Sequence, residues 1–239
     1  MKLSNRMTTL CLPSLLLMLP ITLSAQWQEK PYGKWSEKEA VNVLNNSPWG
    51  QTQEVADTTD MFDIRKTLDS GQIARVAENE RAKFRIRFFS AKPIRQATCR
   101  LIEIKQKGKE DEQLAAKLQA LVDADFSSYV VVTLVIDTAE AGSQRGALAT
   151  MLDKQITSEL KSETYLLAEG GQRVFLKEYQ APHRDGFGAR FIFPRNPDGK
   201  PIINPDSREV IFHTQLKDGP NFHMRFKVKD MMLDGKLEY

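Results

Sequence analysis

Basic side chains alternate with apolar ones in two segments of the chain, residues 81–88 and residues 222–229. A period of two places alternate side chains on opposite faces of a β-strand, so each segment predicts a strand with one cationic face. A row of like charges on a sheet attracts a counter-charge, which makes these faces candidate sites for an anion or a partner. The candidate residues are Arg81, Lys83, Arg85, Arg87, Arg225, Lys227 and Lys229.

The partner of such faces depends on where the two strands lie. If they are neighbours, their like charges need a counter-charge, which an anionic polysaccharide, a lipid headgroup or an envelope protein could supply. The alternative is a solvated sheet face balanced by acids on adjacent strands, such as Glu178 or Glu209. Nucleic acid is not an expected partner, because no aromatic residue is interleaved on the cationic faces.

Histidines offer little for metal or acid–base chemistry. His183, His213 and His223 share no helical spacing that would place two imidazoles on one face, so we predict no metal site. His213 and His223 could still face each other across a hairpin at Asp218-Gly219. We predict no catalytic residue and no cofactor; the alternative is a hydrolase that uses converging carboxylates or His183 with Asp185.

Two glycine-rich motifs resemble catalytic or phosphate-binding loops without matching them. Residues 142–146 (GSQRG) have their first glycine one residue too close to the serine for a nucleophile elbow, and Ser143 fits a helix N-cap. Residues 185–190 (DGFGAR) open a strand instead of a helix, so they lack the convergent amides of a phosphate cradle. We interpret both as turns or caps.

The composition is that of a globular protein. The 239 residues include 34 basic and 31 acidic side chains, a formal net charge of +3, and 41% are hydrophobic. A chain of this composition can bury a core, which excludes wholesale disorder. The small positive balance is not the basic footprint of a nucleic-acid-binding protein.

Residues 1–25 have the pattern of a signal peptide. Lys2 and Arg6 precede an uncharged, largely apolar stretch, and Ala25 stands before a plausible cleavage site. We therefore expect an exported protein of the periplasm or extracellular space, without a transmembrane anchor after cleavage; the alternative is an uncleaved anchor. Cleavage would remove Cys11 and leave Cys99, so we expect no internal disulfide and an inert, buried thiol.

The mature chain divides into three segments. Residues 26–50 form a helix segment flanked by tryptophans, 51–80 a polar linker or loop, and 81–239 an α+β domain. Ser36 and Glu39 have the spacing of a capping box, which predicts a helix starting there. We expect the tryptophan-flanked helix to dock on the main body; the alternatives are a sugar-binding platform and an exposed apolar patch. The tryptophans are Trp27, Trp35 and Trp49.

Helices are expected mostly early and strands mostly late. Apolar spacing predicts helices beginning near residues 90–93, 110 and 143 and ending near 107, 122 and 160. The predicted strands are 82–88, 129–136, 164–168, 173–179, 189–193, 209–215 and 222–228. Four Asp-Gly steps at 185, 198, 218 and 234 favour tight hairpins. The fold class is therefore α+β, with a mostly antiparallel sheet and several packed helices.

Three blocks of the chain resemble a group of uncharacterised exported proteins from environmental bacteria. They are residues 35–40 (WSEKEA) followed by 47–49 (SPW), residues 89–97 (FSAKPIRQA) and residues 191–195 (FIFPR). The resemblance implies export and a single module, and it implies no activity. We expect a non-enzymatic interaction or envelope-associated module.

Overall fold

The protein has an α+β fold built from antiparallel sheets and a group of helices. The computed structural model describes residues 27, 29–55, 82–106, 111–137 and 145–239. The predicted signal peptide (1–25), residues 56–80 of the predicted loop, and the candidate Arg81 lie outside the described residues. Within the described part of the chain, no helix has the length and apolar character needed to cross a membrane.

Two sheets form the body of the molecule. The larger sheet has the order β1-β2-β3-β7-β6 and the smaller one the order β5-β4-β8-β9, with every neighbouring pair antiparallel. The strands of the larger sheet are β1 (Gly50–Val55), β2 (Ala82–Phe88), β3 (Tyr129–Asp137), β6 (Glu178–Gln180) and β7 (Ala189–Pro194). Those of the smaller sheet are β4 (Thr164–Ala168), β5 (Val174–Phe175), β8 (Glu209–Gln215) and β9 (Asn221–Lys227), and a separate hairpin joins β10 (Met232–Leu233) to β11 (Lys236–Leu237).

The two sheets pack face to face through aromatic side chains. Phe191 of β7 lies 5.1 Å from Tyr179 and 5.3 Å from Phe212 of β8, measured between ring centroids. The strand sequences alternate buried and exposed positions, as in β9, where every second residue is buried. This alternation follows from the period of two along a strand, and it gives each sheet one apolar inner face and one polar outer face.

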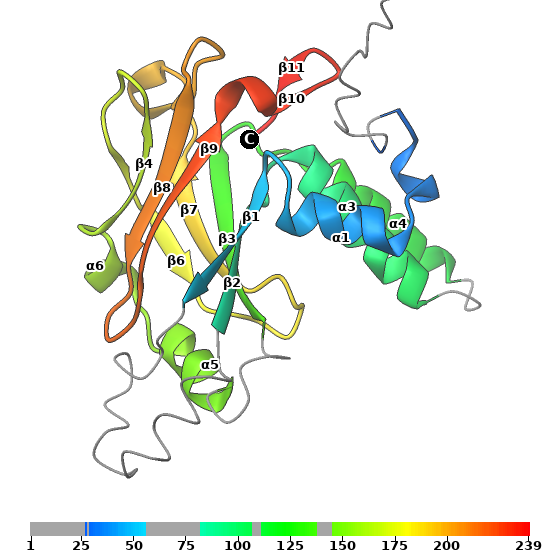
Figure 1. Ribbon diagram of the computed structural model, residues 1–239, viewed down its shortest axis with the longest axis horizontal. Coiled ribbons are helices and arrows are strands. Elements are labelled where there is room, and N and C mark those ends of the chain that lie inside the picture. Colours follow the sequence, from blue (N-terminus) through cyan, green and yellow to red (C-terminus); the bar gives the residue numbers. More distant parts are fainter. Residues whose placement is uncertain (1–26, 28, 56–81, 107–110, 138–144) are drawn as a thin grey trace, which may run out of the picture.

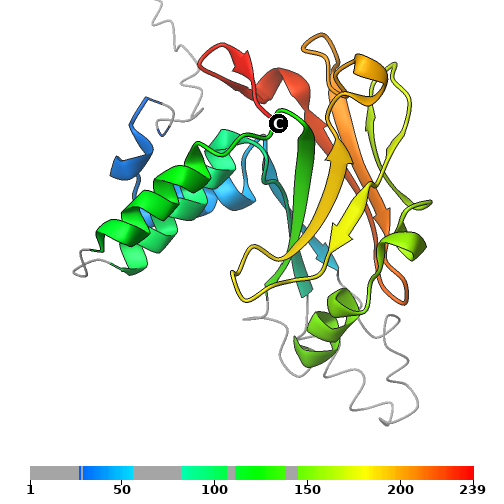
Figure 2. The same cartoon turned by 180° about the vertical axis from the view of Figure 1, so that it is seen from behind.

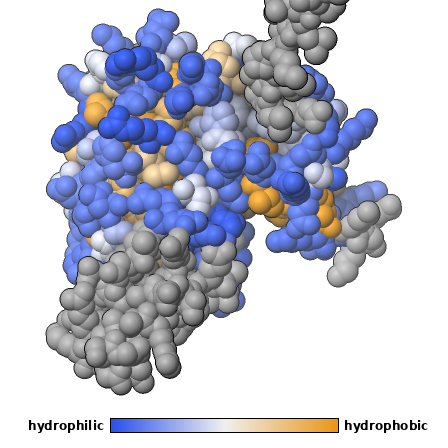
Figure 3. All heavy atoms as spheres, viewed as in Figure 1, coloured by the Kyte–Doolittle hydropathy of each residue, from blue (hydrophilic) through white to orange (hydrophobic). Residues whose placement is uncertain are grey.

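Helices α1 (Glu37–Asn45), α3 (Lys92–Lys105) and α4 (Glu112–Val122) form an arm on one side of the sandwich (Figures 1 and 2). Within the arm α3 packs against both α1 and α4. Pro93 stands in the first turn of α3, where its missing N–H costs no hydrogen bond. Hydrophobic residues gather along the lower edge of the arm in Figure 3, on the side away from the C-terminus.

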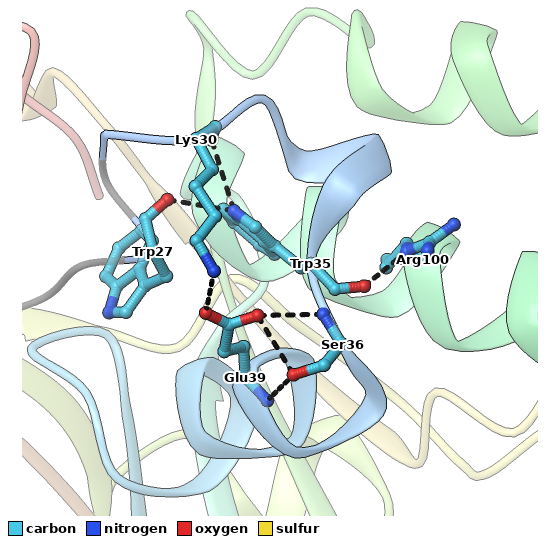
Figure 4. Close-up of polar contacts among 6 residues, drawn as sticks. All are labelled: Trp27, Lys30, Trp35, Ser36, Glu39 and Arg100. Carbon is cyan, nitrogen blue, oxygen red and sulfur yellow. Dashed lines mark hydrogen bonds and ion pairs between the residues drawn. The ribbon is translucent and has the colours of Figure 1, made fainter.

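The capping box predicted at Ser36 and Glu39 is present. The Ser36 hydroxyl accepts a hydrogen bond from the Glu39 amide at 3.2 Å, and the Glu39 carboxylate accepts one from the Ser36 amide at 2.8 Å (Figure 4). Trp35 donates its indole N–H to the Trp27 carbonyl at 2.9 Å. Arg100 of α3 donates to the Trp35 carbonyl at 2.7 Å, which ties the start of α1 to the next helix.

The tryptophans belong to the core. Trp27, Trp35 and Trp49 are 7%, 2% and 0% exposed, so they form neither a sugar-binding platform nor an exposed apolar patch. The Trp49 indole N–H donates to the Glu238 carbonyl at 2.8 Å. The N-terminal segment and the C-terminus are therefore held together, and the predicted docking of the α1 segment on the body is confirmed.

Two differences from the predicted elements concern the predicted loop and the last predicted helix. The predicted loop begins later, because residues 50–55 form β1 at the edge of the larger sheet. The helix predicted over 143–160 is divided into α5 (Arg145–Asp153) and α6 (Thr157–Leu160). Between them the Gln155 side chain is buried and donates to the carbonyls of Met151 and Lys217, which fixes the chain in a turn.

Three of the four Asp-Gly steps connect paired antiparallel strands. They lie between β6 and β7, β8 and β9, and β10 and β11. Asp198-Gly199 instead lies between β7 and β8, which belong to different sheets. Its residues do adopt the positive φ values that the dipeptide favours, 54° and 75°. Asp234-Gly235 has the same conformation, with φ values of 49° and 75°.

Candidate ligand-binding site

A cavity of about 310 Å³ lies between the helical arm and the outer face of the larger sheet. Its size is at the lower end of the range for small-molecule sites. The polar outer positions of β2 and β3 form its floor, and α1, α3 and the loop before β7 form its walls. The apolar lining residues are Val41, Leu44, Phe89, Ile94, Leu101, Ile102, Val135 and Phe187.

Arg87 of β2 is the most buried cation of this cavity. Its Nε donates to the Leu44 carbonyl at 3.0 Å and its Nη2 to Asn45 Oδ1 at 2.7 Å, so the end of α1 holds the guanidinium. Burial, followed by the charge of Arg85, lowers the pKa of Arg87 to about 10, against the opposite effect of Asp137. Arg87 pairs with no carboxylate among the described residues. A cation that is partly withdrawn from water without a counter-ion is destabilising, because it has lost hydration without gaining an opposite charge.

Thr133 of β3 stands directly opposite Arg87 in the sheet register and also lines the cavity. It is 1% exposed. Its hydroxyl has no hydrogen-bond partner within the part of the chain that the structure describes. Buried hydroxyls are normally hydrogen-bonded. The Thr133 hydroxyl is therefore available to donate to a molecule in the cavity.

Two further cations, besides Arg87, contribute to the charge of the cavity lining. Arg85 lines the cavity and forms an ion pair with Asp137 at the end of β3. Lys105, the last residue of α3, stands in the lining without an ion-pair partner in the described chain. Asp185 is the one carboxylate among the described lining residues, and it pairs with Arg190. The cavity therefore keeps a positive surplus, which suits an anion.

The loop before β7 brings Phe187 to the cavity wall. The Phe187 ring lies 5.1 Å from the ring of Phe89, centroid to centroid. Gly188 adopts a φ of +81°, and a Cβ there would stand 2.3 Å from the Leu134 carbonyl oxygen. Only glycine allows this close approach of the loop to β3. The DGFGAR segment is thus a loop that leads into β7, as predicted, and it also forms part of the cavity.

The two predicted cationic faces do not form one surface. Arg225 and Lys227 of β9 line a second, more open hollow of about 760 Å³, together with Gln51 and Thr52 of β1. Arg225 is 61% exposed and pairs with Glu209 at 2.8 Å. Lys229 follows in the turn after β9 and lines neither hollow.

Acids on adjacent strands balance part of the cationic faces. Lys83 of β2 lies 3.6 Å from Glu54 of β1, and Arg225 pairs with Glu209 of β8. These pairs match the alternative of a balanced, solvated sheet face at those positions. Arg87 does not fit that alternative, because it is half-buried and has no carboxylate partner among the described residues.

The structure brings His213 and His223 together. They face each other in the β8–β9 register, with Nδ1 atoms 3.4 Å apart, as the hairpin at Asp218-Gly219 suggested. Burial and then the neighbouring His223 lower the pKa of His213; Glu163 acts to raise it and Arg173 to lower it. The described residues contain no group of three or more His, Cys, Asp or Glu side chains arranged to hold a metal ion.

His183 and Asp185, the pair considered for hydrolysis, are not joined by a hydrogen bond in the described structure. His183 Nδ1 lies 3.2 Å from the Ala181 carbonyl. Burial acts to raise the pKa of Asp185, but the Phe187 amide and Arg190 outweigh it, so the pKa is lowered. Asp185 is thus an ionised partner of Arg190, which is a poor arrangement for a general base.

Sequence reasoning missed most of this cavity. It identified Arg85 and Arg87 as candidates but not Thr133, Phe187 or the apolar side chains of α1 and α3. The one available indication was Thr133 itself, a hydroxyl within an almost continuous apolar strand. The helix residues gave none, because their apolar spacing also fits packing against another helix.

Comparisons with known proteins give no functional assignment. No family model matches the chain, and no curated protein matches it. Among solved structures, the chain is similar to a protein of unknown function from Burkholderia pseudomallei, at 15% identity and a TM-score of 0.40. The similarity covers 68% of this chain and 85% of that one.

Proposed function

We propose that this protein is an exported, non-enzymatic binding module that takes an organic anion into the cavity beneath the helical arm. The observation that carries the proposal is the half-buried guanidinium of Arg87 beside the hydroxyl of Thr133: within the described residues the first has no carboxylate partner and the second no hydrogen bond. A carboxylate between them would accept charge-assisted hydrogen bonds from both groups. It would also supply the missing counter-charge.

The apolar walls of the cavity indicate that the other end of the ligand is a hydrocarbon group. Side chains from α1, α3 and the loop before β7 surround the cavity, so a compact hydrocarbon body would replace water there. This favours an amphipathic molecule over a bare inorganic anion. A chain end or small molecule suits a cavity of about 310 Å³ better than the middle of an anionic polysaccharide.

The lining residues also favour binding over catalysis. The described lining contains no histidine and no cysteine, and its carboxylate, Asp185, is held by Arg190. The Thr98 hydroxyl donates to the Ile94 carbonyl at 2.8 Å. A nucleophile paired with a general base, which hydrolysis would require, is therefore not found among these residues.

Calorimetric titration with octanoate tests the proposal, with octanol as the neutral control and acetate as the headgroup control. We expect octanoate to bind at least roughly tenfold more tightly than octanol, since a bond between charged groups contributes about 1.5–3 kcal/mol. Acetate should bind more weakly than octanoate because it leaves the apolar walls uncovered. Equal affinity for octanoate and octanol would contradict the role of Arg87.

Thr133→Val is the sharpest variant, because it removes the hydroxyl and keeps the shape. It should weaken octanoate binding several-fold while leaving thermal stability unchanged or higher, since the hydroxyl has no partner to lose among the described residues. Lys229→Gln removes a cation outside both hollows and serves as the matched control. Equal effects of the two variants would show that the cavity is not the site.

Export is tested separately by the mass of the mature protein. The cationic start, apolar stretch and Ala25 predict cleavage before Gln26 when the chain is expressed with a functional secretion system. Detection of the uncleaved chain in the membrane fraction would support the alternative of an anchor. This outcome would leave the cavity proposal unaffected.

A further inference from the structure

We infer that His213 and His223 form a two-ligand site for a zinc ion on the outer face of the smaller sheet. The two residues lie directly opposite each other on β8 and β9, and their Nδ1 atoms are 3.4 Å apart. They share this face with Tyr165 of β4, whose ring stacks on that of His213. The histidine pair lies apart from the organic-anion cavity, which is on the larger sheet.

The separation of the two nitrogens matches a tetrahedral zinc ion. Zinc–nitrogen bonds are about 2.0–2.1 Å, and at a tetrahedral angle two such nitrogens stand about 3.3–3.4 Å apart. The observed 3.4 Å agrees with this edge length. The two Nδ1 atoms face each other at hydrogen-bond distance, so a small movement of the rings, with both nitrogens unprotonated, would let them share one ion. Zinc can therefore bind without a change in strand register.

Neighbouring side chains hold one ligand in place. The Tyr165 and His213 rings are stacked, with centroids 4.8 Å apart and planes 25° from parallel. On the Tyr165 ring lies the Arg173 guanidinium, 4.6 Å from the centroid. His213 is thus oriented before any ion arrives, which reduces the conformational entropy lost on binding.

The site is open. No third His, Cys, Asp or Glu completes the group within the described residues, so water or an external ligand would occupy the remaining positions. An open two-histidine site binds more weakly than a closed structural site of four ligands. It is accordingly a site for reversible capture of zinc and not a requirement for folding.

Calorimetric titration of zinc chloride into the full chain tests the inference, in a Cys11→Ser background that removes a competing thiol. We expect one zinc ion per chain. His213→Ala and His223→Ala should each weaken binding by roughly tenfold or more, because even outer-shell losses cost 10–100-fold. The double variant should bind no more weakly than either single variant, since the loss of one ligand already destroys the shared site.

His183→Ala is the matched control, because His183 lies in the loop before β7, away from the pair. It should leave the affinity unchanged. Unchanged melting temperature of His223→Ala, an exposed position, would show that lost binding is not lost folding. Equal weakening by His183→Ala, or wild-type affinity in both single variants, would overturn the inference.

Discussion

Phe84 of β2 and Phe222 of β9 meet edge to face inside the sandwich, with ring centroids 5.0 Å apart. Phe88 and Phe226 make a second contact of the same kind at 4.8 Å. The two strands with alternating basic residues are therefore neighbours, but through their apolar faces. Their cationic faces point away from each other, so Arg87 and Arg225 line different hollows on the surface of the molecule.

Truncating a phenylalanine side chain at this contact should strongly destabilise the protein. We expect Phe222→Ala to lower the free energy of unfolding by about 3–5 kcal/mol, because it leaves a cavity between two sheets. Phe175→Ala is the matched control, since Phe175 is 43% exposed on β5. Urea unfolding of both variants measures the difference. Similar losses in the two variants would mean that the sheets do not share this core.

Two glycines in the loop before β7 distinguish the cost of backbone strain from the cost of a steric clash. Gly186 and Gly188 have φ values of +77° and +81°, but only at Gly188 would a Cβ collide, 2.3 Å from the Leu134 carbonyl oxygen. We expect Gly186→Ala to cost about 1 kcal/mol and Gly188→Ala clearly more. The same urea unfolding measurement tests the pair. Equal costs would show that the loop does not approach β3 as closely as described.

The capping box of α1 should contribute a pH-dependent stability. Hydrogen bonds from Lys30 and then Ser36 lower the pKa of Glu39 from 4.5 to about 2. A carboxyl whose pKa is lowered by folding stabilises the protein above its unfolded pKa, and the contribution is lost as the pH falls toward 2. Glu39→Gln should therefore be less stable at neutral pH, by less than about 1 kcal/mol because water screens the pair.

The difference between wild type and Glu39→Gln should shrink as the pH is lowered through that range. Glu37→Gln provides the control, because Glu37 lies in the same first turn but outside the capping box. It shares the favourable interaction with the helix dipole without the bonds to Ser36 and Lys30. A constant difference at every pH would contradict the role assigned to Glu39.

Local patterns predicted the elements better than the site. The period of two over residues 82–88 and the capping box at Ser36 each depend on neighbours in the chain, and both appear as predicted. The break at Gln155 depends on the Lys217 carbonyl, 62 residues away, so no local pattern contains it. Contacts of this kind form only when distant segments pack together.

The cavity likewise depends on contacts between distant segments of the chain. Arg87 lies on β2, but its burial comes from Leu44 and Asn45 at the end of α1. A threonine in a strand is ordinary, and Thr133 becomes unusual only because the fold leaves its hydroxyl buried and unbonded among the described residues. The sequence pattern could therefore identify a cationic face but not which of its charges lacks a partner.

The thiol of Cys99 should be unreactive in the folded protein. Burial, followed by the charge of Glu103, raises its pKa to about 11, and the thiol donates to the Leu118 carbonyl at 3.4 Å. At mildly alkaline pH almost none of it is the reactive thiolate. In a Cys11→Ser chain, a thiol reagent should label Cys99 slowly in buffer and quickly in urea. Rapid labelling without denaturant would show that α3 and α4 separate readily, because Cys99 is buried between them with Leu118 and Val122.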